Sequence, residues 1–217
     1  MNISSSKENI LKKIRKALSE STPLPFSSSE GNQSVFVQRD EDLALVFAEA
    51  FSALQGRFAF CLNEQELAAQ LKALIVDRKW ESIYVRDRQI REQLRAMGIP
   101  ALTESVDMPA LKACDASVTG CDCLVARTGT MVLSAGQESG RTTSVYAPVH
   151  ICIAYTDQLV YDVRDGLKYV KDKYGDKLPS LISFATGPSR TADIEKTLVV
   201  GVHGPKEVFC FLVNSQH

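Results

Sequence analysis

The chain has no long apolar run. None of its segments approaches the roughly 20 consecutive apolar residues of a membrane-spanning helix. Residues 1–20 alternate charged with apolar side chains, unlike the continuous apolar block of a signal peptide. We therefore expect a soluble, cytoplasmic protein without a membrane span. Its 217 residues suit one sizeable domain with an appendage.

The chain also lacks an excess of charge of either sign. Its 25 Lys and Arg residues nearly balance 26 Asp and Glu residues, for a formal net charge of −1. Binding of nucleic acid by bulk electrostatics needs a clustered basic surface that displaces counterions. We therefore expect no nucleic-acid partner.

Patterns of metal-binding cysteines are missing. The chain has six cysteines but no C-x-x-C motif, and the only close pair, Cys121 and Cys123, is a weak metal candidate. Most of the cysteines lie in apolar stretches such as 58–62 and 207–213. We expect free, buried thiols and no metal site.

Several catalytic signatures are absent as well. The sequence contains no G-x-S-x-G, no H-E-x-x-H, no G-x-G-x-x-G and no G-x-x-x-x-G-K-[ST]. Serine hydrolases with a nucleophile elbow, zinc proteases and dehydrogenases with a dinucleotide fingerprint are therefore poor candidates.

The first segment predicts an amphipathic helix followed by a linker. Residues 21–34 are rich in Ser and Pro and have no periodicity. We divide the chain into residues 1–34 and an α/β domain at 35–217. The helix either docks on a partner or lies against its own domain, and the pattern does not separate the two. Its apolar stripe consists of Ile3, Ile10, Leu11, Ile14 and Leu18.

Helical and strand patterns alternate between residues 40 and 98. Asn63, with Glu66 three residues later, resembles a capping box that opens a helix. The alternation predicts parallel strands covered by helices. The expected helices are 41–54, 66–78 and 88–98, and the expected strands are 57–62 and 82–86.

From about Ala116 the pattern changes to short strands that leave no room for helices. Their close spacing predicts an antiparallel meander inserted in the sheet. A last helix is expected at 163–173, followed by buried strands at 181–187, 197–204 and 207–213. The meander strands are expected at 116–120, 123–126, 130–135, 150–155 and 159–162.

The stretch 186–196 is the most informative polar segment. Ser189 and Thr191 bracket Arg190 after a Gly-Pro pair, in what we expect to be the start of a short helix. Backbone N–H groups at a helix start and a guanidinium suit a phosphate or carboxylate. Alternatively, a hydroxyl caps the helix while Arg190 pairs with a nearby acid.

A histidine flanked by glycines follows closely. His203 and Gly204 end an apolar run, where an imidazole can exchange protons and glycine lets a ligand approach the backbone. The alternative is a plain turn in which His203 binds a carbonyl group.

The third segment is a Thr-Gly-Thr turn with a polar loop behind it. Thr128, Gly129 and Thr130 join two strands, and Arg141 lies in the Gly-flanked loop that follows. Two tight turns would explain this pattern equally well, but long loops in compact domains are often functional.

These segments also carry a family resemblance. Residues 187–213, 119–137 and 148–154 resemble the lactate-utilisation C proteins, the LUD-domain family. The resemblance implies a three-layer NagB/RpiA/CoA-transferase-like α/β fold, with a mainly parallel sheet and ligands at the strand ends. It also implies a part in bacterial oxidation of L-lactate to pyruvate by a three-protein system. Iron–sulfur clusters are then expected on a partner subunit, with no cofactor on this chain.

Many members of that family have an acid before the Thr-Gly-Thr turn, where this chain has Arg127. If the acid is catalytic in the relatives, that chemistry cannot be transferred to this position.

The leading hypothesis is a subunit with a small-anion site. Arg190 and Arg141 would bind the anion, Ser189 and Thr191 would donate hydrogen bonds, and His203 would relay protons. One alternative is a non-catalytic scaffold that binds the iron–sulfur partner through residues 1–34. The other is an independent enzyme acting on a CoA ester or sugar phosphate.

Overall fold

A computed structural model describes residues 5–19, 42–103, 105, 107–192 and 198–215. Internal contacts divide the chain into residues 1–39 and 40–217, and each unit is described by itself. In the first unit, α1 (Ser5–Ser19) confirms the expected amphipathic helix. The predicted linker at 21–34 lies outside the described residues. Within the described parts, no helix has both the length and the apolarity to cross a membrane.

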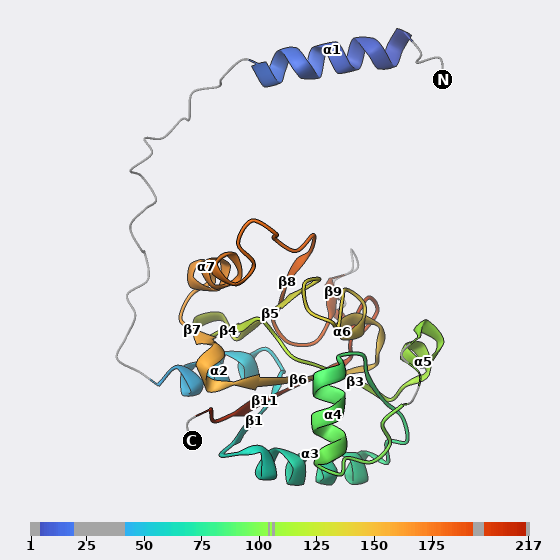
Figure 1. Ribbon diagram of the computed structural model, residues 1–217, viewed down its shortest axis with the longest axis vertical. Helices are drawn as coiled ribbons and strands as arrows, with labels where there is room; N and C mark the ends of the chain where they lie inside the picture. The colour runs from blue at the N-terminus through green and yellow to red at the C-terminus, as the bar shows by residue number, and fades with distance from the viewer. Residues whose placement is uncertain (1–4, 20–41, 104, 106, 193–197, 216–217) are drawn as a thin grey trace. The chain divides into compact units, whose positions relative to one another are not determined.

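The centre of the second unit is a five-stranded sheet in which every neighbouring pair of strands is parallel (Figure 1). Its core strands, β6 and β11, pair over seven residues each and place Cys152 beside Cys210. The mainly parallel α/β architecture predicted from the alternating pattern is therefore confirmed. In spatial order the strands are β1 (Arg57–Cys61), β11 (Glu207–Val213), β6 (Val149–Tyr155), β3 (Ala116–Thr119) and β2 (Ile83–Val85).

Helices begin where the sequence offers capping side chains. Asn63 Oδ1 accepts the backbone N–H of Glu66 at 2.9 Å, and Glu66 Oε2 accepts the N–H of Leu62 at 2.7 Å, which confirms the predicted start. The short helices α5 and α6 were not predicted. The helices are α2 (Leu43–Ala53), α3 (Glu64–Arg78), α4 (Arg88–Ala96), α5 (Met108–Ala113), α6 (Thr143–Tyr146) and α7 (Val163–Tyr174).

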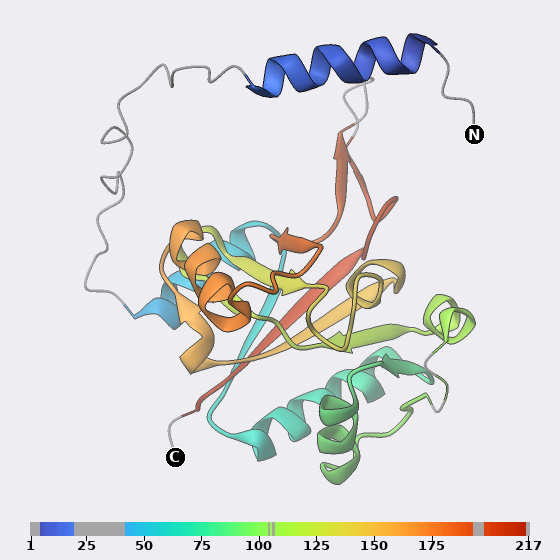
Figure 2. The same ribbon diagram turned by 45° about the horizontal axis from the view of Figure 1, so that its top comes forward.

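The two faces of the parallel sheet differ in chemistry. One face is apolar and is covered by α3 and α4 through residues such as Leu71 and Leu94. Figure 2 shows these two helices, in teal and green, on one side of the sheet. The opposite face packs on α2 through Phe47, but its β3 and β6 part carries the buried polar residues Ser117, Thr119 and His150. Because strand side chains alternate, a polar residue at every second position marks this second face.

A separate four-stranded sheet lies over that second face. β5 is antiparallel to β4 and β8, whereas β7 is parallel to β4. The expected strands at 116–120 and 150–155 therefore belong to the parallel sheet, and only the rest of the meander forms the second one. The strands are β7 (Leu159–Val160), β4 (Cys123–Val125), β5 (Thr130–Ser134) and β8 (Ile182–Ala185).

Two further expectations are corrected at the end of the chain. Residues Arg190–Ala192 form strand β9, paired with β10 (Leu198–Val200), rather than the start of a helix. The reason is that both backbone groups of Ser189 bond to the turn at 201–205, which holds this segment extended. The strands expected at 181–187 and 197–204 are also less buried than predicted. β8 is only half-buried, and Val200 of β10 is exposed.

Candidate functional site

The two motifs around Ser189 and His203 lie against each other. The N–H of Ser189 donates to the carbonyl of Pro205 at 3.0 Å, and the N–H of Gly201 donates to the carbonyl of Ser189 at 2.9 Å. A Cβ on Gly204 would lie 2.9 Å from the Cβ of Ser189, so a larger residue there would push the two segments apart. The structure thus brings together Ser189, His203 and Gly204 as the sequence suggested.

These segments form one wall of a pocket of about 280 Å³. The pocket lies between the second sheet and the amino-terminal parts of β6 and β11, because His203 precedes β11 and His150 is the second residue of β6. Its polar lining consists of hydroxyl groups and two imidazoles. The lining residues are Met131, Leu133, Ser144, Val145, His150, Ser183, Ala185, Thr186, Gly187, Pro188, Ser189, His203, Gly204, Pro205 and Val208.

His150 is the main site residue that the sequence reasoning missed. Its side chain is buried, and burial lowers its pKa to about 4, so the imidazole is neutral at physiological pH. Its Nε2 atom lies 2.8 Å from Oγ1 of Thr119 on β3. The available signal was a histidine within the otherwise apolar run 149–154.

A chain of threonine hydroxyls reaches the pocket from the Thr-Gly-Thr turn. Oγ1 of Thr130 lies 2.8 Å from that of Thr128 and 2.9 Å from that of Thr186, which lines the pocket. Gly129 packs against the backbone of helix α2 and does not face the pocket. Its φ is +59°, and a Cβ there would lie 2.4 Å from the backbone nitrogen of Phe51. The turn therefore positions Thr186 and packs against α2.

Neither arginine of the expected anion site is among the described residues that line the pocket. Arg190 Nη2 donates to the carbonyl of Leu54, at the carboxyl end of α2, where a cation also offsets the helix dipole. Arg141 Nη2 donates to the hydroxyl of Ser180. Thr191 pairs with Val199 in the β9–β10 hairpin. The structure therefore places these three residues outside the lining of the pocket.

Arg127, directly before the Thr-Gly-Thr turn, forms an ion pair with Asp162. The Nη2–Oδ1 distance is 2.6 Å. Burial would raise the pKa of Asp162, but the hydrogen bonds from Arg127 and from the N–H of Val163 lower it. Because Asp162 is the N-cap of α7, the pair joins the Thr-Gly-Thr turn to the start of that helix.

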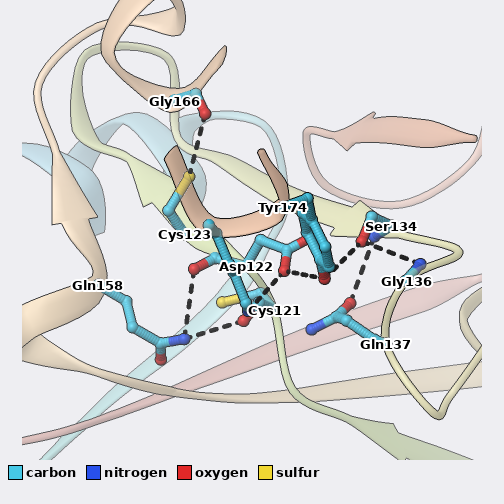
Figure 3. Close-up of polar contacts among 10 residues, drawn as sticks. Cys121, Asp122, Cys123, Ser134, Gly136, Gln137, Gln158, Gly166 and Tyr174 are labelled. Atoms are coloured by element: carbon cyan, nitrogen blue, oxygen red, sulfur yellow. Dashed lines mark hydrogen bonds and ion pairs between the residues drawn. The ribbon is translucent and has the colours of Figure 1, made fainter. Parts of the chain in front are cut away.

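A second buried polar cluster surrounds Asp122, just before β4 (Figure 3). Its Oδ1 accepts hydrogen bonds from Lys173 Nζ at 2.8 Å and from the hydroxyl of Tyr174 at 2.9 Å. That hydroxyl also lies 3.1 Å from Oγ of Ser134 on β5. Burial would lower the pKa of Lys173, but the hydrogen bond to Asp122 raises it, so the ammonium stays charged. The cluster attaches the end of α7 to the second sheet.

All six thiols are free and buried. Burial raises the pKa of Cys61 and of Cys114 to about 11 and that of Cys123 to about 12, so these thiols stay protonated at neutral pH. The six are divided among four separate apolar clusters. Among the described residues, no group of His, Cys, Asp and Glu is arranged to hold a metal ion.

Comparison with known proteins identifies the sequence family. The model of the LUD domain family matches residues 44–213. Lactate utilization protein C of Halalkalibacterium halodurans is 40% identical over 101 residues, which are 46% of this chain and 44% of that protein. Lactate utilization protein C 1 of Bacillus mycoides is 36% identical over 124 residues, covering 56% and 52%. The match thus spans about half the length of these curated relatives.

A solved structure shares the fold. The crystal structure of a DUF162 family protein from Deinococcus radiodurans superposes with a TM-score of 0.56 at 21% identity, covering 79% of this chain and 96% of that one. At this identity the similarity concerns the fold alone.

Proposed function

Because the chain belongs to the LUD domain family, we propose that it serves in bacterial lactate utilisation and binds a small 2-hydroxy or 2-keto carboxylate in the pocket around His203. The observation that carries this proposal is the meeting of two segments, 187–189 and 203–205, on the wall of one pocket. The names of the relatives support the pathway, and the geometry of the pocket supports the choice of site.

The chemistry of the lining suits such an acid. The hydroxyl groups of Ser189 and Thr186 can donate hydrogen bonds to a carboxylate, and the exposed imidazole of His203 can form a further hydrogen bond to the ligand. His150 stays neutral and contributes a hydrogen bond without a charge. A volume of about 280 Å³ is at the small end of ligand sites and fits a three-carbon acid better than a CoA ester.

Oxidation of lactate to pyruvate removes two electrons and two protons, so the reaction needs an electron acceptor. We propose that an iron–sulfur subunit of the same system accepts these electrons. The thiols of this chain are poor ligands for an iron–sulfur cluster, because all six are buried and those of Cys61, Cys114 and Cys123 stay protonated. His203 would accept the proton of the substrate hydroxyl, the hydrogen on C2 would leave as a proton to solvent, and the two electrons would pass one at a time to the iron–sulfur partner.

Calorimetric titration of the full chain with L-lactate and with pyruvate tests the site. We expect saturable binding, weakened by about tenfold or more in Ser189→Ala and in His203→Ala, because each substitution removes a polar partner of the ligand. Ser52→Ala, an exposed serine on α2, is the matched control and should bind as the wild type does. No heat from either acid at concentrations up to about 10 mM, or equal affinity in all variants, would contradict the proposal.

A scaffold role is the second candidate, favoured by the amphipathic character of helix α1. In α1, Ile10 and Ile14 lie one turn apart, as in helices that dock an apolar stripe on a partner. Deletion of residues 1–34 should abolish association with the iron–sulfur partner if this role is correct, and should leave carboxylate binding intact. Unchanged association would exclude it.

A further inference from the structure

A second pocket, of about 490 Å³, lies at the opposite end of the parallel strands. Asp87 follows the end of β2 by two residues, Gly120 directly follows β3, and Tyr155 is the last residue of β6. Open α/β sheets characteristically bind ligands outside the carboxyl ends of their strands. This pocket therefore occupies a position suited to a ligand and is distinct from the pocket around His203.

One wall of this pocket is a fixed hydrogen-bonded group. Nε2 of Gln93 donates to Oε1 of Glu64 at 2.8 Å and to the hydroxyl of Tyr155 at 2.7 Å. Burial raises the pKa of Tyr155, and the negative charge of Glu64 raises it further, so the phenol keeps its proton. Its oxygen accepts from Gln93 and its O–H bonds to Glu64, so these three side chains form a closed hydrogen-bonded group, and Asp87 is left to accept hydrogen bonds from a ligand.

The other wall combines an acceptor with an apolar base. Oδ1 of Asp87 accepts the backbone N–H of Ile90 at 3.1 Å as the N-cap of α4, and the carboxylate has further lone pairs for a ligand. Ile90 and Ile153 provide apolar contact, and Gly120 lies between them. A Cβ on Gly120 would lie 3.4 Å from Cδ1 of Ile90, so a side chain there would occupy the base of the pocket without severe strain.

Charge decides which class of ligand fits. Glu64 and Asp87 are the charged side chains of the lining, and no Lys or Arg is among the described residues that form it. Two carboxylates repel a phosphate or carboxylate ligand, and they accept hydrogen bonds from hydroxyl groups. The remaining polar lining consists of the amides Gln89, Gln93 and Gln158 and the phenol of Tyr155.

We propose that this pocket binds an uncharged, hydroxyl-bearing ligand of the nucleoside class. Asp87 would accept hydrogen bonds from the ribose hydroxyls, and the base would lie on Ile90 and Ile153. Dinucleotide-binding folds likewise hold a ribose by hydrogen bonds from its hydroxyl to a carboxylate. A volume of about 490 Å³ accommodates a nucleoside.

Adenosine is the probe, titrated calorimetrically into the full chain, with AMP and 2′,3′-dideoxyadenosine as comparisons. We expect adenosine to bind, AMP to bind no more tightly, and the dideoxy analogue to lose about tenfold or more, because it leaves the polar groups of the pocket unpaired. Gly120→Val should abolish adenosine binding by filling the pocket. Asp87→Asn should weaken it by about tenfold while keeping the helix cap, since Asn caps as well as Asp.

Three results would overturn the inference: no binding of adenosine at about 10 mM, equal affinity for the dideoxy analogue, or unchanged affinity in Gly120→Val. AMP binding more tightly than adenosine would equally contradict it, since that outcome defines an anion site. Titration of Gly120→Val with L-lactate is the control. It should match the wild type, because the two pockets share no lining residue.

Discussion

Nε2 of His150 lies 2.8 Å from Oγ1 of Thr119 on the neighbouring parallel strand, and both side chains are buried. An imidazole in this setting is held neutral, because protonation would place a charge inside the molecule without a counter-ion. The pair joins the core of the sheet to the pocket that contains His203.

The stability of the protein should therefore depend on pH through His150. Its folded pKa of about 4 lies below the 6.5 of an unperturbed histidine, so the unfolded chain binds more protons between these values. The free energy of unfolding should fall by about 2 kcal/mol from this residue as the pH drops from 7 to 5. Urea unfolding of the wild type and of His150→Asn measures this. Between pH 7 and pH 5 the free energy of unfolding of the variant should fall by about 2 kcal/mol less than that of the wild type. An equal fall in the two proteins would refute the prediction.

Gly129 should be sensitive to the smallest substitution. Its φ is positive and an added Cβ would clash with the backbone of α2 at Phe51, so we expect Gly129→Ala to cost about 3 kcal/mol or more. Gly98, after the end of α4, also has a positive φ, of +68°, and an added Cβ would meet only the flexible end of Lys72 at 3.5 Å, so Gly98→Ala should cost only about 1 kcal/mol. The difference, measured by thermal or urea unfolding, isolates the close contact with α2. Equal losses would show that backbone strain alone constrains Gly129.

The two partners of the buried ion pair should differ in their effect on stability. Lys173→Met leaves Asp122, which has no exposed surface, without its counter-ion, and should cost about 3 kcal/mol. Asp122→Asn should cost less, about 1 kcal/mol, because Tyr174 can still donate to the amide oxygen and Lys173, with 42% of its side chain exposed, can turn to water.

A double-mutant cycle in urea measures the coupling of this pair. The double variant should be more stable than Lys173→Met alone, since it removes the uncompensated charge. If Asp122→Asn costs as much as Lys173→Met, the explanation by buried charge fails.

Arg190 should affect stability more than binding. Its guanidinium bonds to the carbonyl of Leu54 at the end of α2, so Arg190→Ala should cost about 1 kcal/mol and leave the affinity for L-lactate unchanged. Arg88→Ala is the control, because the exposed Arg88 pairs only at 3.6 Å with Glu92 and its loss should cost no more than about 0.5 kcal/mol. A large loss of lactate affinity in Arg190→Ala would contradict this prediction and support the original expectation that Arg190 binds the anion.

Local signals predicted the parallel part of the fold well. Asn63 and Glu66 marked a helix start, and apolar runs of the right length marked β1, β6 and β11. The pattern could not assign strands to sheets, because β3 and β4 are both short and close together in the sequence, and only their long-range pairing shows that they belong to different sheets. The extended form of Arg190–Ala192 was missed for the same reason, since it depends on hydrogen bonds between Ser189 and a turn more than ten residues away.

The site was predicted in part. Ser189, His203 and Gly204 were recognised from glycine-flanked polar residues, and they share one pocket. The sequence could not show that Arg190 bonds to Leu54 and Arg141 to Ser180. An arginine that binds a ligand and one that bonds to a distant part of its own chain cannot be distinguished from the residues beside them. His150 was missed because the sequence of a strand does not show which of its faces lines a pocket. That depends on the neighbouring strands and on the sheet packed against them.

The position of β11 has a consequence for synthesis of the protein. β11 is the last strand in the chain, but it lies between β1 and β6 and provides the pairing of β1, the first strand. During translation about 150 residues are added after β1 before its neighbour β11 emerges. Pairings between strands so far apart in the sequence form slowly. Apolar residues of the incomplete sheet are exposed in that interval, so the nascent chain is at greatest risk of aggregation until β11 has emerged and paired.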